Sequence, residues 1–198
     1  MIEGNNMGNY TYKQIDFDHP PFLFVLEDKP KNILGGPLLY NPYFKTFGLN
    51  GSERVLDFGC GGGAGSRCLA KLLNSSGHLT CVDISDYWIT RAKHTLKKCT
   101  RVECMAGNIR ELDILENSFD IISIIHVSHD IPPKDRQSIV DRLSKLLALE
   151  GKIFLREPIK ESHGIPIREI QSLLLNSGLT EVTSESGKSE YKGVYTYS

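Results

Sequence analysis

The sequence predicts an α/β domain in which a mostly parallel sheet carries helices on both faces. Short apolar segments alternate with segments whose apolar residues recur at helical spacing, and this alternation is typical of parallel sheets. Phe119–Ile125 is a nearly continuous apolar run bounded by polar residues, which indicates a strand buried on both faces. A length of 198 residues fits one such domain.

The individual elements follow from local signals. Ser85 is a good N-cap for the helix that follows it, and the prolines at 132–133 suit the first turn of another helix. The apolar stripe of that second helix ends at Leu147, and Gly151 closes the predicted loop after it. Gly178 is the stop signal of a third helix. Strands are predicted at 54–58, 79–82, 101–105, 119–125, 152–155, 181–185 and 191–197, and a further helix at 66–73.

The first part of the chain, 1–50, is predicted to form a small cap on a single domain over 51–198. Aromatic residues are concentrated in this region, together with five prolines. Proline interrupts long helices, so short helices and loops are expected. Aromatic side chains need a surface to pack on, so the cap is expected to rest on the domain.

Charge and cysteine content limit the classes of partner. The chain has 23 basic and 24 acidic residues and a formal net charge of −1, so it lacks the basic excess of typical nucleic-acid-binding proteins. No apolar run approaches the ~20 residues of a membrane span. Five cysteines without a Cys-x-x-Cys pair indicate a reducing, cytoplasmic compartment and no zinc site. These features favour a small or neutral ligand and leave the oligomeric state open.

The chemistry is expected at the carboxyl ends of the strands, where parallel sheets bind ligands. The first strand contains Asp57 and leads into a glycine-rich run at 59–63, which reads Gly-Cys-Gly-Gly-Gly. Glycines there let the backbone turn sharply and approach a ligand closely. Taken alone, this turn fits a dinucleotide, another nucleoside, or no ligand at all.

Polar residues also end the second and third strands. Asp83 lies 24 positions after Gly59, where a carboxylate can accept hydrogen bonds from both hydroxyls of a ribose. Asn108 follows the third strand, and its amide could read the amino group of adenine while the backbone of Ile109 serves a ring nitrogen. The alternatives are a helix-capping aspartate and a plain turn asparagine.

In this order and spacing, the motifs resemble those of class I S-adenosylmethionine-dependent methyltransferases. The resemblance covers about residues 50–160 and rests on the runs at 55–63, 83–85, 117–120 and 156–158. It is closest to the small-molecule (type 11-like) branch, which includes quinone, sterol and small-metabolite methyltransferases. It implies a Rossmann-like, doubly wound sheet of seven strands in the order 3-2-1-4-5-7-6, the last antiparallel. It also implies that the N-terminal cap selects the acceptor.

The resemblance further implies which residues contact the cofactor, S-adenosylmethionine. Asp57 would lie near the methionine amino group, and Asp83 would hold the ribose. Trp88 would pack near the adenine, although a core position on its helix is nearly as good an interpretation. At the position of Asn108, the resembling family more usually has an acidic residue. The residues implied for cofactor binding are Asp57, Gly59, Cys60, Gly61, Asp83, Ile84, Trp88, Asn108, Ile109 and His126.

The end of the fourth strand carries the candidates for catalysis. His126 and His129 lie at the tip that faces the methyl group in the resembling family, and an imidazole there could take a proton from an acceptor oxygen or nitrogen. The alternative is that both only line the pocket. No third ligand at regular spacing accompanies them, so no metal is predicted. The candidates for an apolar acceptor pocket or lid, with plain packing as the alternative, are Tyr12, Phe22, Tyr40 and Tyr43.

The sequence leaves three functions open. They are methyl transfer from S-adenosylmethionine to a small-molecule acceptor, non-catalytic binding of that cofactor, and nicotinamide-dependent oxidoreduction. Asp57 disfavours the third, because a carboxylate just before the first glycine would repel a pyrophosphate but not a cationic sulfonium amino acid. The identity of the acceptor stays open.

Overall fold

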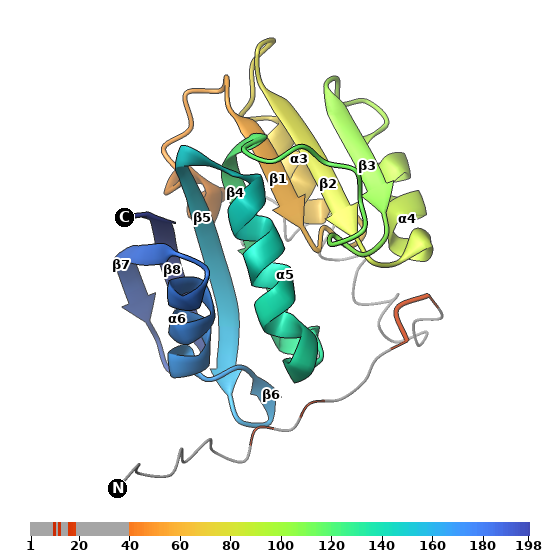
Figure 1. The fold of residues 1–198 in the computed structure, drawn as a ribbon. Coiled ribbons are helices and arrows are strands. Elements are labelled where there is room, and N and C mark those ends of the chain that lie inside the picture. Colours follow the sequence, from red (N-terminus) through yellow and green to blue (C-terminus); the bar gives the residue numbers. More distant parts are fainter. Residues whose placement is uncertain (1–9, 11, 13–15, 19–39) are drawn as a thin grey trace, which may run out of the picture.

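The computed structural model describes residues 10, 12, 16–18 and 40–198. Within these ranges a single central sheet is flanked by helices on both faces (Figure 1). The strands are β1 (Arg54–Phe58), β2 (His78–Asp83), β3 (Val102–Ala106), β4 (Phe119–Ile125), β5 (Leu147–Lys160), β6 (His163–Gly164), β7 (Leu179–Ser186) and β8 (Glu190–Tyr197). The helices are α2 (Asn41–Lys45), α3 (Ala64–Ala70), α4 (Asp86–Leu96), α5 (Pro133–Leu146) and α6 (Ile167–Asn176), with a short 3₁₀ turn at Ser128–Asp130.

The strand order confirms the predicted topology. The sheet runs β3-β2-β1-β4-β5-β8-β7, with the first five strands parallel. β8 is antiparallel to both β5 and β7. Because β7 and β8 are the sixth and seventh long strands, this is the order 3-2-1-4-5-7-6. The two-residue β6 pairs with β5 off this path, and the sequence pattern did not predict it.

The start of β5 differs from the prediction. The strand begins at Leu147 rather than at 152, so Gly151 lies within it and not at the end of a loop. Leu147 is buried as the first residue of the strand, not as the end of a helical stripe. It pairs with Phe119, and the register shifts before Ile121. A bulge of this kind absorbs extra residues without ending the strand, so the prediction of a loop was wrong.

Two apolar cores lie on opposite faces of the sheet. On β1, Leu56 belongs to the core under α5 and α6, while its neighbour Val55 belongs to the core under α2, α3 and α4. Ile122 and Ile121 of β4 divide in the same way. Successive side chains of a strand point to opposite faces, so a strand with helices on both sides is apolar at most of its positions. The burial of both neighbours explains the continuous apolar run.

The described part of the N-terminal region packs against the second core. The ring of Phe47 stacks on Phe154 of β5 with 3.9 Å between centroids, and it meets Tyr43 and Phe44 edge-on. Phe44 is almost completely buried. The aromatic residues at 43–47 therefore anchor α2 to the sheet. Phe22, one of the four candidates for an acceptor pocket or lid, lies outside the described residues.

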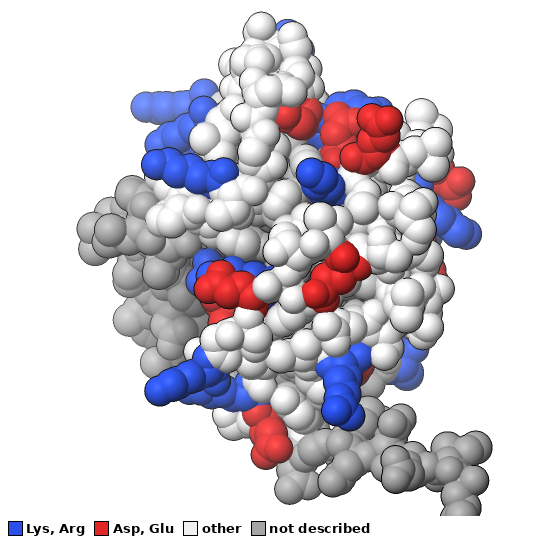
Figure 2. All heavy atoms as spheres, turned by 90° about the vertical axis from the view of Figure 1, so that its left-hand side faces the viewer, with Lys and Arg blue, Asp and Glu red and all other residues white. Residues whose placement is uncertain are grey.

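The outer surface gives two further facts. In the part of the chain that the structure describes, no helix combines the length and apolar character needed to cross a membrane. Figure 2 shows the face at the β7 edge, where acidic and basic side chains are interspersed in small groups. On this face no single sign of charge predominates.

Candidate active site

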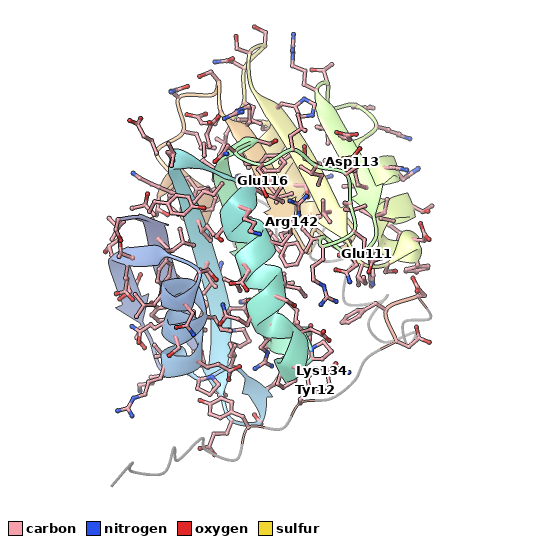
Figure 3. All side chains as sticks on the ribbon, in the orientation of Figure 1. Tyr12, Glu111, Asp113, Glu116, Lys134 and Arg142 are labelled. Atoms are coloured by element: carbon pink, nitrogen blue, oxygen red, sulfur yellow. The ribbon has the colours of Figure 1, made fainter. Side chains whose placement is uncertain are left out.

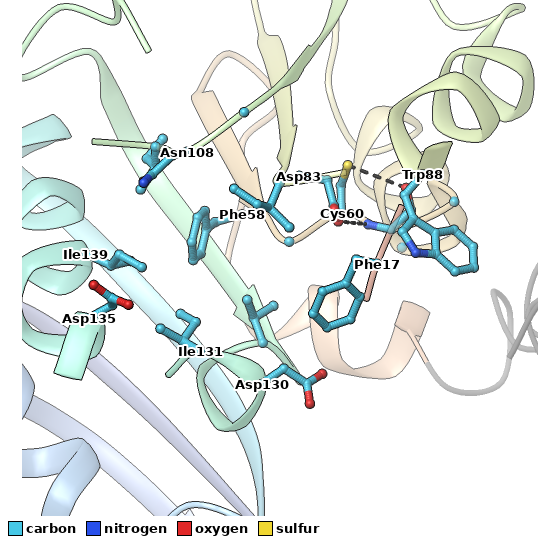
Figure 4. Close-up of a pocket in the computed structure, with 18 of the residues that line it drawn as sticks. Phe17, Phe58, Cys60, Asp83, Trp88, Asn108, Asp130, Ile131, Asp135 and Ile139 are labelled. Atoms are coloured by element: carbon cyan, nitrogen blue, oxygen red, sulfur yellow. Dashed lines mark hydrogen bonds between the residues drawn. The ribbon is translucent and has the colours of Figure 1, made fainter. Parts of the chain in front are cut away.

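A cavity of about 540 Å³ opens at the carboxyl ends of β1 to β4 (Figure 4). This is the edge of the sheet where strand order reverses between β1 and β4, the expected place for a ligand. Its volume falls within the range of about 300–1,000 Å³ for small-molecule sites. The predicted cofactor residues that line it are Gly59, Cys60, Gly61, Asp83, Ile84, Trp88, Asn108 and Ile109.

The glycine-rich turn forms one wall of the cavity. Gly59, Gly61 and Gly63 all have positive φ angles, of 73°, 50° and 81°, which side chains other than glycine rarely adopt. A Cβ atom on Gly59 would lie 2.3 Å from a methyl carbon of Val127, whereas one on Gly61 would meet nothing within 4 Å. Gly59 is thus required for packing, and Gly61 presents open backbone to the cavity.

Asp83 connects this turn to the end of β2. Its Oδ2 accepts a hydrogen bond from the Gly61 amide at 2.9 Å, and its Oδ1 accepts one from the Ser85 amide at 3.1 Å. Burial raises the pKa of Asp83 against the opposing effect of these amides. The Ser85 hydroxyl accepts the Trp88 amide at 3.3 Å, which confirms the predicted cap. Ser85 is thus the cap of α4, and Asp83 lines the cavity.

The loop after β3 forms the opposite wall, with Asn108 and Ile109. The Asn108 side-chain oxygen accepts the amide of Arg110 at 3.2 Å. Arg142 of α5 donates to the carbonyls of Ile109, Leu112 and Ile114, and Figure 3 shows it projecting from α5 toward this loop. A guanidinium that bonds to three carbonyls holds the loop in place.

Two predicted cofactor residues do not line the cavity. Asp57 is buried beneath the turn, where its Oδ2 accepts the Ser66 hydroxyl at 2.6 Å. Burial raises the pKa of Asp57 to about 6, although the hydroxyls of Ser66 and Ser123 oppose the shift. His126 has a φ of 56° and its ring faces β8, where Nε2 lies 2.9 Å from Glu190.

His129, the other catalytic candidate, is buried beside the cavity. Its Nδ1 lies 2.8 Å from Oε2 of Glu157, and its Nε2 lies 3.1 Å from Nε2 of His163. Glu157 is 0% exposed, and its Oε1 accepts the amides of Val127 and Ser128. Burial lowers the pKa of His129, but the hydrogen bond and charge of Glu157 outweigh this and raise it. Asp130, the next residue, lines the cavity.

Sequence reasoning missed part of this cluster. Glu157 was recognised only as part of a motif, although an acidic residue inside a buried apolar strand is itself a signal. Asp130 is not among the candidates that the sequence indicates, although it directly follows His129. In the described residues, no group of three or more His, Cys, Asp or Glu side chains is arranged to hold a metal ion.

The remaining wall is apolar and aromatic. Two of the candidates for an acceptor pocket or lid, Tyr12 and Tyr40, line it together with Phe17, whose backbone carbonyl accepts the Ser85 hydroxyl at 2.8 Å. Tyr43 is buried and packs on Phe44 instead of lining the cavity. The apolar residues that complete this end are Phe58, Val127, Ile131, Pro132 and Ile139. One cavity therefore joins a polar end near β2 and β3 to an apolar end near β4.

Known proteins resemble the chain in sequence over its first strands. The family model described as a methyltransferase domain matches residues 55–151. A carboxy-S-adenosyl-L-methionine synthase of Chromohalobacter salexigens is 32% identical over 109 residues, which cover 53% of this chain and 40% of that protein. A ubiquinone biosynthesis O-methyltransferase of Xanthomonas oryzae is 30% identical over 104 residues, 52% of this chain and 41% of that protein. The chain thus spans about two fifths of the length of these curated relatives.

Solved structures share the fold over most of the chain. A SAM-dependent methyltransferase from Aquifex aeolicus superposes with a TM-score of 0.72 at 18% identity, covering 87% of this chain and 95% of the other. A TehB-like SAM-dependent methyltransferase from Corynebacterium glutamicum gives 0.73 at 14% identity, with 89% and 97% covered. Residues 55–151 thus match a methyltransferase domain in sequence, and over most of its length the chain shares the fold of class I S-adenosylmethionine-dependent methyltransferases.

Proposed function

We propose that this chain transfers a methyl group from S-adenosylmethionine to a small-molecule acceptor. The observation that carries the proposal is the single cavity that joins nucleoside-type polar groups to an apolar, aromatic end. The polar end suits a cofactor, and the apolar end suits an acceptor held in line with it. Relatives of the chain are named ubiquinone biosynthesis O-methyltransferases, which supports this class.

The polar end fits the nucleoside part of the cofactor. Asp83 presents a carboxylate to the cavity, and Gly61 leaves its backbone face open there. Trp88 and Ile84 add apolar surface beside them. A ribose that bonds to the carboxylate would place its adenine toward Asn108, on the adjacent strand end.

The chain contributes binding, orientation and exclusion of water to the reaction. The bound cofactor supplies a methyl group on a positively charged sulfur, which is electrophilic without further activation. Holding the acceptor in line with that group lowers the entropic part of the barrier. The apolar side chains of Phe58, Val127 and Ile131 line the cavity and would keep water from the bound methyl group.

The near-neutral charge of the chain supports a small acceptor over a nucleic acid. All five cysteines are free thiols, which supports the proposed cytoplasmic location.

Calorimetry with S-adenosylmethionine, its demethylated product and NAD tests the cofactor site. We expect Asp83→Ala to weaken S-adenosylmethionine binding by about 1–3 kcal/mol, or roughly 5- to 150-fold, because ribose hydroxyls lose their partner. Asp83→Asn keeps the size of the side chain and removes one acceptor, so it should give a smaller loss. Asp86→Ala is the matched control, since Asp86 is exposed in the first turn of α4.

Two results would contradict the proposal in different ways. Binding of NAD without binding of S-adenosylmethionine would overturn the cofactor assignment. Tight cofactor binding without methylated product, across a panel of phenols, amines, thiols and carbon acids with labelled cofactor, would identify a non-catalytic binding module.

A further inference from the structure

We propose that Asp130, His129 and His163 form a path that carries a proton from the methyl acceptor to solvent. The acceptor is then an O–H or N–H nucleophile, not a thiolate or a carbanion. The inference rests on the proposed methyl transfer and adds the acceptor class and a proton route to it.

The three side chains lead in order from the cavity to the surface. Asp130 lines the cavity, and Figure 4 shows it at the edge near Phe17. Its Oδ1 lies 3.5 Å from Nε2 of His129, and that same nitrogen lies 3.1 Å from Nε2 of His163. His129 is buried, whereas His163 on β6 is exposed. A proton taken up in the cavity thus has a continuous connection to water.

Glu157 determines which nitrogen of His129 can take the proton. Its Oε1 already accepts the amides of Val127 and Ser128 at 2.8 and 2.6 Å. Its Oε2 faces Nδ1 of His129 at 2.8 Å, so this nitrogen carries the hydrogen and donates it to the carboxylate. Nε2 then has a free lone pair and faces Asp130 and His163. Glu157 is a positioning residue, because it orients the ring without touching the cavity.

The charges around His129 favour uptake of a proton. Glu157 lies on β5, Asp130 on the same 3₁₀ turn and His163 on β6, and all approach the ring directly. Arg136 of α5 donates to the carbonyl of His129 at 3.3 Å, but it is paired with Glu169 at 2.6 Å. The ring centroid of His126 lies 6.4 Å away. The two carboxylates outweigh the arginine, and the pKa of His129 is raised despite burial.

Asp130 is suited to take the first proton. It is partly buried, and burial raises the pKa of its carboxyl against the opposing charges of His129 and His163. A carboxylate in such surroundings is a stronger base than an exposed one. Asp135 also lines the cavity, but it is paired with Arg110 at 3.3 Å. Of these two carboxylates, Asp130 is therefore the one that both lines the cavity and is connected to solvent through His129 and His163.

The proton balance of the step is complete. The lone pair of the acceptor oxygen or nitrogen forms the new bond to the methyl carbon, and the electron pair of the broken C–S bond stays on sulfur. The acceptor then gives its proton to Asp130, which passes it to Nε2 of His129. His129 donates it to Nε2 of His163 as His163 releases its Nδ1 proton to water, and proton exchange between the exposed ring and water restores the starting tautomer. One proton leaves per methyl group transferred, and no oxidant or reductant is needed.

The test compares pH profiles of turnover in three variants of the full chain. His129→Asn keeps a donor for Glu157 but removes the group that titrates, and we expect kcat for a phenol or amine acceptor to fall about 10²- to 10⁴-fold. The unmodified enzyme should lose activity as the pH falls through the raised pKa of His129, and the variant should lack this limb. S-adenosylmethionine affinity should stay within twofold. His94→Gln, on the exposed face of α4, is the control.

If His129→Asn prevents folding, His163→Gln still tests the path. His163 is exposed, so its substitution is not expected to disturb the fold. We expect a fall of about tenfold in kcat with the KM for the acceptor unchanged. Glu157→Gln should shift the pH profile toward lower pH, because the imidazolium loses its charged partner.

Each outcome has a distinct meaning. With an O–H or N–H acceptor, an unchanged kcat in His163→Gln or an unchanged pH profile in a folded His129→Asn would overturn the path alone. Turnover restricted to thiols or carbon acids would overturn the acceptor class. Absence of S-adenosylmethionine binding by the unmodified chain would overturn the proposed function, and the proton path with it.

Discussion

Replacing Asp57 by asparagine should make the ligand-free protein more stable at neutral pH. The carboxyl group of Asp57 is 5% exposed, and its Oδ2 accepts the Ser66 hydroxyl at 2.6 Å. Burial raises its pKa from 3.8 to about 6, and the nearby charge of Asp83 adds to the shift. The folded state therefore holds a proton that the unfolded chain releases more readily. An asparagine keeps the acceptor oxygen for Ser66 and carries no charge to desolvate.

The magnitude and the sign follow from proton linkage. A shift of about two pKa units corresponds to about 3 kcal/mol at ~1.36 kcal/mol per unit. Because the folded pKa is above the unfolded one, the favourable contribution of the protonated carboxyl is present below about pH 4. It is lost as the pH rises to about 6. Relative to the unmodified chain, Asp57→Asn should therefore gain up to about 3 kcal/mol of unfolding free energy between pH 4 and pH 7.

Urea unfolding at half-unit intervals from pH 4 to pH 8 measures this difference directly. A constant difference between the two proteins across this range would refute the reasoning, since the linkage requires it to grow with pH. Adding S-adenosylmethionine gives a second test. If Asp57 faces the methionine amino group, the cofactor should stabilise the unmodified chain more than the variant at pH 7.

Two further substitutions test packing, both by urea unfolding without ligand. Gly61→Ala should cost about 1–2 kcal/mol from its positive φ alone, and Gly59→Ala about 1–3 kcal/mol more, because its Cβ would meet Val127 at 2.3 Å. Equal losses would show that this contact does not determine the turn. Phe47→Ala should cost about 3–5 kcal/mol by removing the ring stacked on Phe154. A loss under ~1 kcal/mol would mean that α2 is not anchored there.

Sequence patterns were sufficient to predict the elements that depend on interactions between residues close together in the chain. Phe119–Ile125 could be assigned in full, because a strand covered on both faces is a nearly continuous apolar run. Ser85 could be assigned as a cap, because its hydroxyl bonds within the same turn. The start of β5 could not be assigned from the sequence. It depends on pairing between Leu147 and Phe119 and on a bulge between partners far apart in the chain.

The candidate site also contains residues that the sequence could place and residues that it could not. Asp83 and Asn108 could be placed at one edge from sequence, because the carboxyl ends of parallel strands share an edge. The role of Glu157 could not be predicted from the sequence, since it accepts hydrogen bonds from backbone amides 29 and 30 residues away. Nor could sequence show that His126 turns to Glu190 on β8 while His129 turns inward.

The sequence by itself determined the order of strands and helices, the glycine-rich turn, and the acidic and amide residues that follow the strands. These depend on hydrophobic period, backbone freedom and chain order, all of which are properties of neighbouring residues. Only the tertiary structure decided which buried carboxylate meets which histidine, and which aromatic residues close the cavity. Such contacts join segments that are distant in the chain, so their geometry is set by the packing of the whole sheet.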